Sequence, residues 1–211
     1  AQSPGDVEPL FGSPTTSGNT LLFNNMDFSS SSSGEFGNDT TIGQLTTTIT
    51  ANDLIGINGL MFSEVGSVSL SGLSNDAVAS VAATYVFSIL EVNGDAIDPI
   101  VTALNMVFTP SGGDYQLSVD GILSSQIWNG SVDADVDAIL MAEYDDYEDG
   151  DVATQVSLVL TNSLTTLSEA GTSAFIGKKQ IGGFSVTSIV PTPAAFALLA
   201  VGGLIGRRRR R

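Results

Sequence analysis

Acidic side chains provide the most concentrated reactive groups in this sequence. Asp133, Asp135 and Asp137 alternate with apolar residues, so on a strand their carboxylates would share one face. The stretch 145–151 adds five more acids. Carboxylate oxygens are ligands that calcium prefers, which gives a weak calcium site with the candidate ligands Asp133, Asp135, Asp137, Asp145, Asp149 and Asp151. An EF-hand is excluded because Tyr147 takes the third ligand position and no glutamate closes the loop. We therefore favour a solvated acidic surface and expect no cofactor.

Enzyme classes are limited by the absence of histidine and cysteine. Ser-His-Asp and Cys-His nucleophiles are excluded, as are imidazole and thiolate metal sites. A glycosidase that uses two carboxylates is compatible with this composition, but no motif selects two acids that would face each other across a cleft. We expect a protein that is not an enzyme.

Trp128 is the only tryptophan and has two possible roles. With Tyr144 and Tyr147 nearby in sequence, it could stack on a sugar ring, as in a carbohydrate-binding module. A single large aromatic residue at a strand end packs more often in the core or at its rim. Packing is the favoured interpretation, and carbohydrate binding is the alternative.

Charge excludes nucleic acid as a partner. The chain has 23 acidic and 7 basic residues and a formal net charge of −16. Five of the basic residues are Arg207 to Arg211, so the rest of the chain has only Lys178 and Lys179 and a net charge of −21. A body with this charge would be repelled by phosphates, whose recognition depends on lysine and arginine.

Alternating apolar and polar residues predict an all-β fold. In 44–50, for example, Leu45, Thr47 and Ile49 share one face of a strand. Turn signals lie between the apolar segments at Asn93-Gly94, at 110–113, at Asn129-Gly130 and at Asp149-Gly150. Short strands at this spacing are typical of an antiparallel β-sandwich, here jelly-roll-like. The other expected strands are 65–70, 85–90, 100–108, 115–119, 122–128, 132–141, 152–160 and 184–190, whereas 76–83 also fits a helical face.

Composition divides the chain into three parts. Residues 1–18 are rich in Pro, Gly, Ser and Thr and predict a flexible leader; 19–186 hold the predicted sandwich, and 187–211 a C-terminal segment. Within the sandwich, Ser29–Ser33 is expected to be a flexible polar tract. The opening Ala1-Gln2 resembles what remains after a signal peptide is cleaved, so we expect export.

The C-terminal segment combines a proline motif, an apolar run and a basic cluster. Val190-Pro191-Thr192-Pro193 precedes 194–206, which carries no charged side chain, and then Arg207, Arg208, Arg209, Arg210 and Arg211. A helix over 194–206 would rise about 20 Å, short of a hydrocarbon core of roughly 30 Å, so it suits temporary membrane retention. The arginines would remain cytoplasmic and the body outside. The apolar contacts with lipid would come from Ala194, Phe196, Leu198, Leu199, Val201, Leu204 and Ile205.

This order of elements resembles the PEP-CTERM sorting signal of Gram-negative bacteria. That family has Val-Pro-Glu-Pro before a short hydrophobic stretch and an arginine cluster, and here Thr192 occupies the glutamate position. The resemblance covers residues 190–211. It implies an exosortase as processing partner, transient anchoring in the inner membrane, and release to the cell surface or extracellular matrix. A plain tail anchor is the alternative, but it would not require the Pro-x-Pro element.

The sequence thus predicts an exported surface or matrix protein with a structural or adhesive role. Extracellular polysaccharide is a candidate partner. A carbohydrate-binding module on the same sandwich is the second interpretation, and a carboxylate-based glycosidase is the third.

Overall fold

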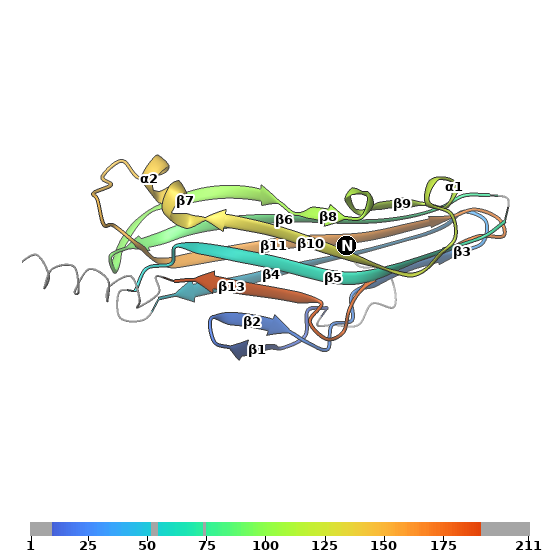
Figure 1. Cartoon of the computed structure of the whole chain (residues 1–211), viewed down its shortest axis with the longest axis horizontal. Coiled ribbons are helices and arrows are strands. Elements are labelled where there is room, and N and C mark those ends of the chain that lie inside the picture. Colours follow the sequence, from blue (N-terminus) through green and yellow to red (C-terminus); the bar gives the residue numbers. More distant parts are fainter. Residues whose placement is uncertain (1–9, 52–54, 74, 191–211) are drawn as a thin grey trace, which may run out of the picture.

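The fold is an antiparallel β-sandwich, elongated along its strands (Figure 1). It is seen in a computed structural model that describes residues 10–51, 55–73 and 75–190. All strand pairs among these residues are antiparallel. The prediction of an all-β antiparallel sandwich is confirmed.

Sheet A is built around one long strand, β5 (Gly59–Ser71). β10 pairs with one edge of β5, while β13 and β12 share the other edge one after the other. β2 and β3 pair in turn with β13 and β12, and β1 and β8 lie at the outside. The bounds are β1 (Pro14–Ser17), β2 (Thr20–Phe23), β3 (Ser29–Ser33), β8 (Val107–Thr109), β10 (Leu123–Asp135), β12 (Ser173–Lys178) and β13 (Phe184–Ile189).

Sheet B packs against sheet A in the order β4, β11, β6 and β7, and β9 pairs with a further part of β6. The chain alternates between the sheets along most of its length: it changes sheet at every connection from β3 to β12 except that between β6 and β7. The bounds are β4 (Gly37–Thr50), β6 (Ala77–Val92), β7 (Asp95–Asn105), β9 (Asp114–Gln116) and β11 (Ala153–Ser168), with the short helices η1 (Ser111–Gly113), α1 (Leu117–Asp120) and α2 (Val136–Glu143).

Period-two alternation explains the core between the sheets. In β11, Val156, Leu158 and Leu160 are fully buried, while the residues between them are half-buried and face outward. β6 has the same pattern, which places the Tyr85 ring over Phe62 of β5 with centroids 4.5 Å apart. Segment 76–83, which also fitted a helix, is therefore strand from Ala77 onward.

The Asn93-Gly94 turn was predicted correctly. It joins β6 to β7 as a two-residue hairpin, because Val92 pairs directly with Asp95. Both turn residues have positive φ, 53° for Asn93 and 88° for Gly94. These are the residue types that tolerate such a turn, which explains why the sequence signal was reliable here.

The turn predicted at Asn129-Gly130 is wrong, because both residues lie inside β10. Gly130 faces the core, where a Cβ would collide with Met106 and the Phe108 ring. This glycine allows close packing rather than a turn. The two strands expected at 122–128 and 132–141 are consequently one strand, followed by helix α2.

The N-terminal part of the described chain is more ordered than predicted. Leu10 and Phe11 are buried, and β1 begins at Pro14, so the flexible leader does not extend to residue 18. Ser29–Ser33 is strand β3 instead of a flexible tract, because it pairs with β12. Its buried Ser30 hydroxyl lies 2.9 Å from the hydroxyl of Thr166.

Two further boundaries differ from the prediction. β13 continues to Ile189, so the sandwich extends beyond residue 186. The strand expected at 115–119 is divided between β9 and α1. The predicted hydrophobic helix within 194–206 lies outside the described residues, and no helix among the described ones is long and apolar enough to cross a membrane.

Candidate functional site

Polar side chains interrupt the apolar core at one point between the sheets. Glu64 comes from β5 and Lys178 from the end of β12, both in sheet A. Tyr85 and Asn162 come from β6 and β11 of sheet B. The side chains of Glu64 and Lys178 have no exposed surface, and Tyr85 and Asn162 are fully buried. We call these four residues the buried polar cluster.

The carboxylate of Glu64 is the centre of this cluster. Lys178 Nζ lies 2.6 Å from Oε2 and forms an ion pair with it. The other oxygen, Oε1, accepts a hydrogen bond of 3.0 Å from the Tyr85 hydroxyl and one of 2.5 Å from Asn162 Nδ2. One carboxylate thus contacts an amine from its own sheet and an amide and a phenol from the opposite sheet.

Aromatic rings surround the ammonium group of Lys178. Its Nζ lies 5.8 Å from the centroid of Phe11, 5.4 Å from that of Phe28 and 5.7 Å from that of Phe184. All three rings are buried. They stabilise a cation at their faces and also separate the amine from solvent.

Burial changes the proton affinities of this cluster. Desolvation lowers the pKa of Lys178, and the neighbouring Glu64 carboxylate opposes that change. Desolvation also raises the pKa of Tyr85, and the charge of Glu64 raises it further, so Tyr85 remains a hydrogen-bond donor. The site therefore contains an amine that burial drives toward its neutral, nucleophilic form.

Three atoms in the cluster lack hydrogen-bond partners within the part of the chain that the structure describes, and two of them, Glu64 Oε2 and Lys178 Nζ, form the ion pair with each other. The third atom, Asn162 Oδ1, has no partner among these residues. Buried polar atoms without partners are unusual and cost stability. An amine, a carboxylate and an amide are held together here, away from water.

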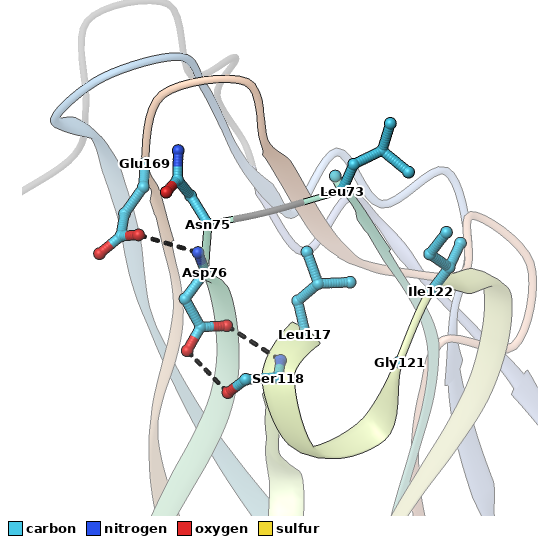
Figure 2. A pocket seen from close by; sticks show the side chains of 9 residues that line it. Leu73, Asn75, Asp76, Leu117, Ser118, Gly121, Ile122 and Glu169 are labelled. Carbon is cyan, nitrogen blue, oxygen red and sulfur yellow. Dashed lines mark hydrogen bonds between the residues drawn. The ribbon is translucent and has the colours of Figure 1, made fainter.

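The second candidate site is a surface hollow beside α1 (Figure 2). Helix α1 lies at the opposite end of the sandwich from α2 (Figure 1). Asp76, Ser118 and Glu169 contribute polar groups to the hollow, and Leu73 and Ile122 are exposed apolar side chains at its margin. Figure 2 shows that the carboxylate of Glu169 accepts from the backbone N–H of Asp76. The acids of this hollow are thus engaged in holding loops together.

Asp76 is the main connection between the loop before β6 and helix α1. Its carboxylate accepts from the Gln116 side chain, from the N–H and hydroxyl of Ser118 at 3.1 and 2.9 Å, and from the N–H of Ala77 at 2.9 Å. These bonds, first that from Gln116, hold the pKa of Asp76 below its usual range.

Asp76 should therefore stabilise the fold in a pH-dependent way. Its folded-state pKa lies below the unfolded value, so its contribution is complete above the unfolded pKa of about 3.9 and is lost as pH falls through the lower folded value. We expect Asp76→Asn to lower the melting temperature at pH 6. We also expect the melting temperature of this variant to decrease less between pH 6 and pH 2 than that of the wild type. Thermal melts from pH 6 to pH 2 measure this, with Asp98→Asn at an exposed position of β7 as the control. Equal acid sensitivity in wild type and Asp76→Asn would contradict it.

The predicted acidic residues do not assemble into one site. β10 ends at Asp135, which caps α2 by accepting from the N–H of Ala138 at 3.0 Å. Asp137 lies in the helix and accepts from the side chain of Asn58, so the three aspartates do not share one strand face. Asp133 faces outward from β10.

The acidic loop after α2 is held by its own hydrogen bonds. Asp151 accepts from the N–H of Glu148 at 2.8 Å and from the side chain of Asn93 at 2.6 Å, while Asp145 and Asp149 are exposed. Among the described residues, no three acids are grouped closely enough to hold a metal ion.

Trp128 does not form a sugar-stacking surface. It is fully buried and packs edge to face on Phe108 with centroids 5.7 Å apart. Tyr144 and Tyr147 are partly buried and pack against the core. The favoured prediction, that Trp128 packs in the core, is confirmed.

The sorting residues lie almost entirely outside the described residues. Val190 is half-buried directly after β13, and Pro191, Thr192, Pro193, the apolar run and the arginines follow beyond it. None of the four residues of the buried polar cluster, Glu64, Tyr85, Asn162 and Lys178, was predicted from the sequence as a site residue. The alternation along the strands could have identified them, because each occupies an inward position in line with buried apolar residues of its own strand.

Comparisons with known proteins identify no family. No protein-family model matches the sequence, and no curated protein is detectably similar. Among solved structures, the enzymatically active domain of bacteriophage CBA120 tailspike protein 4 is similar over 84% of this chain and 18% of its own, with 11% identity and a TM-score of 0.24. The CBM22-1 xylan-binding domain of Paenibacillus barcinonensis Xyn10C matches 86% of this chain and 97% of its own, with 12% identity and a TM-score of 0.19. Likenesses this weak carry no argument about function.

Proposed function

We propose that this chain is an exported, non-enzymatic structural protein of the cell surface or extracellular matrix. The observation that carries the proposal is the outer face of sheet B. Along β4, β11 and β6 it is a broad, uncharged surface on which hydroxyl side chains outnumber apolar ones. The polar residues of its central part are Gln44, Thr46, Thr48, Ser80, Thr84, Ser88, Ser157, Thr161, Ser163 and Thr165, and Ile42, Ala82, Val86 and Val159 lie among them.

This face suits contact with a hydrated matrix. Its central part carries neither a charge nor an aromatic ring among the described residues. Binding of single sugars usually needs an aromatic platform, and catalysis needs groups that converge on a reacting atom. An extended polar surface of this kind favours many weak contacts over one specific pocket.

The C-terminal segment supports export of this body. Pro191 and Pro193 would hold the junction extended and keep it out of a helix, because proline lacks the N–H donor and restricts the residue before it. The arginines resist transfer across the membrane. Together these features would pause the chain at the membrane with an accessible peptide outside, where an exosortase could cleave it.

Carbohydrate binding is the second candidate function, and one feature of sheet A favours it. Phe175 of β12 faces outward, 40% exposed, beside a small hollow lined by Ser31, Ser69 and Ser173. An exposed ring among hydroxyl groups could stack on a sugar and hydrogen-bond to it.

Processing is the test of the proposed function. We expect the protein from its native cells to occur at the surface or in the medium, with its C-terminus near Pro193 and without the arginines. Mass spectrometry of that C-terminus measures it, and a Pro191→Ala/Pro193→Ala variant should accumulate uncleaved. Recovery of an intact Arg211 terminus from membranes of exosortase-positive cells would overturn the sorting function.

Polysaccharide binding distinguishes the two candidate functions. Affinity electrophoresis of the purified protein in matrix polysaccharide should show retardation that does not depend on Phe175. The control is Phe36→Ala, which removes another exposed ring. Saturable binding that is lost in Phe175→Ala and kept in Phe36→Ala would show that the protein recognises carbohydrate, and it would contradict the structural function.

A further inference from the structure

The buried polar cluster holds the complete set of groups for an amide-forming reaction. Lys178 of sheet A supplies an amine, Asn162 of sheet B an amide, and both contact the same Glu64 carboxylate. We propose that Lys178 and Asn162 join in the folded protein through a covalent amide bond, an isopeptide, with Glu64 as the catalytic residue that moves the protons. This inference does not depend on the proposed function.

The environment of Lys178 favours a nucleophilic amine. Nucleophilic attack needs the unprotonated form, and Glu64 Oε2 lies 2.6 Å from Nζ, in position to take the proton. Transfer of that proton replaces two buried charges by a neutral amine and a neutral acid, which a site without water favours. Desolvation lowers the pKa of Lys178 in the same direction.

The amide nitrogen of Asn162, which would leave as ammonia, is hydrogen-bonded to the carboxylate of Glu64. Nδ2 donates to Glu64 Oε1 at 2.5 Å, and Oδ1 is buried without a hydrogen-bond partner among the described residues. A proton on the Glu64 carboxyl can therefore reach the nitrogen that must depart. The fixed geometry supplies the proximity that an amine and an amide lack in solution.

The reaction balances without a cofactor. Glu64 takes one proton from the Lys178 ammonium, and neutral Nζ attacks Cγ of Asn162. As the new C–N bond forms, the Glu64 acid gives its proton to Nδ2, and the carboxylate takes a second proton from Nζ. The Cγ–Nδ2 bond then breaks and ammonia leaves. The products are the amide, one ammonia and the neutral acid of Glu64, with no oxidation or reduction.

The surrounding core protects both the reaction and its product. Phe11, Phe28 and Phe184 surround Nζ, and Tyr85 donates to the Glu64 carboxylate from the other sheet. Exclusion of water prevents hydrolysis of the activated amide. The new bond would connect β12 to β11 and so tie sheet A to sheet B through the core.

Mass spectrometry of the purified full chain tests the bond. We expect an intact mass lower than the sequence mass by one ammonia. A protease that cleaves after glutamate would cut at Glu169, between Asn162 and Lys178. Unlinked protein gives two separate peptides, whereas linked protein gives one branched peptide that contains both residues.

Matched variants assign the three roles. Lys178→Met, Asn162→Leu and Glu64→Gln should all restore the full mass and the two separate peptides. The exposed neighbour Lys179→Met should keep the branched peptide. Because core variants can fail to fold, the wild-type result alone is decisive. Folded wild-type protein with the full sequence mass and two separate peptides after long incubation would overturn the proposal, and so would an ammonia loss that maps to another asparagine.

Discussion

Lys178→Met should lower the free energy of unfolding by at least about 3 kcal/mol relative to the chain with an intact Lys178–Glu64 ion pair, because it leaves the Glu64 carboxylate buried without a cation. In a chain that carries the proposed amide, loss of that cross-link adds to the cost. Truncating one partner of a buried ion pair typically costs about 3–5 kcal/mol, far more than loss of an exposed charge. Lys179→Met, one position along the chain at an exposed site, should change the stability by less than about 0.5 kcal/mol. Urea unfolding followed by circular dichroism measures both.

Adding Glu64→Gln to Lys178→Met shows how much of the lost stability comes from the unpaired Glu64 charge. Lys178→Met/Glu64→Gln removes the charge but keeps an acceptor for Tyr85 and Asn162, so it should be clearly more stable than Lys178→Met. Neither variant can form the amide proposed above, so this comparison reports the buried charge alone. Equal stability of the two variants would show that Glu64 is not a buried carboxylate.

Trp128→Ala should lower the free energy of unfolding by about 3–5 kcal/mol, as is usual when a fully buried large aromatic side chain is removed. The indole fills the space beside Phe108 and over Gly66, where a Cβ would collide with its ring. The remaining cavity could not collapse easily, because both neighbours are held in the strands of sheet A.

The exposed ring of Phe36 provides the control for this effect. Phe36→Ala should cost less than about 1 kcal/mol, since that side chain is 88% exposed. Thermal and urea unfolding by far-ultraviolet circular dichroism compare the two without relying on tryptophan fluorescence. A cost below 1 kcal/mol for Trp128→Ala would mean that the indole is not part of the core.

Strand alternation predicted the fold class because it reflects burial directly. β5, β6 and β11 each have one apolar face, and that pattern is visible in the sequence. Turn signals were less reliable: Asn93-Gly94 closes a hairpin, whereas Gly130 sits inside a strand where Phe108 leaves no room for a side chain. The dipeptide looks the same in both places, and tertiary packing decides its role.

The same alternation could have identified the buried polar cluster. Glu64 lies in register with the buried residues Phe62 and Val68, and Asn162 with Leu160 and Leu164. Lys178 follows Ala174 and Ile176 on the inner face of β12, while Lys179 leaves that face. What the sequence could not supply is the pairing of sheets A and B, which alone brings these side chains to one carboxylate.

The order of strands has a consequence for how the molecule folds during synthesis. β2 and β3, near the start of the described chain, pair with β13 and β12, so sheet A is incomplete until the chain has been made to Ile189. Such distant pairings slow folding, and sandwiches dominated by them fold in about milliseconds to seconds. A chain emerging from the ribosome thus has no finished sheet until β11 ends at Ser168, and no finished sandwich until β13 ends at Ile189. For the export proposed above, this delay would keep the chain unfolded and able to pass through a narrow translocation channel before the sandwich closes.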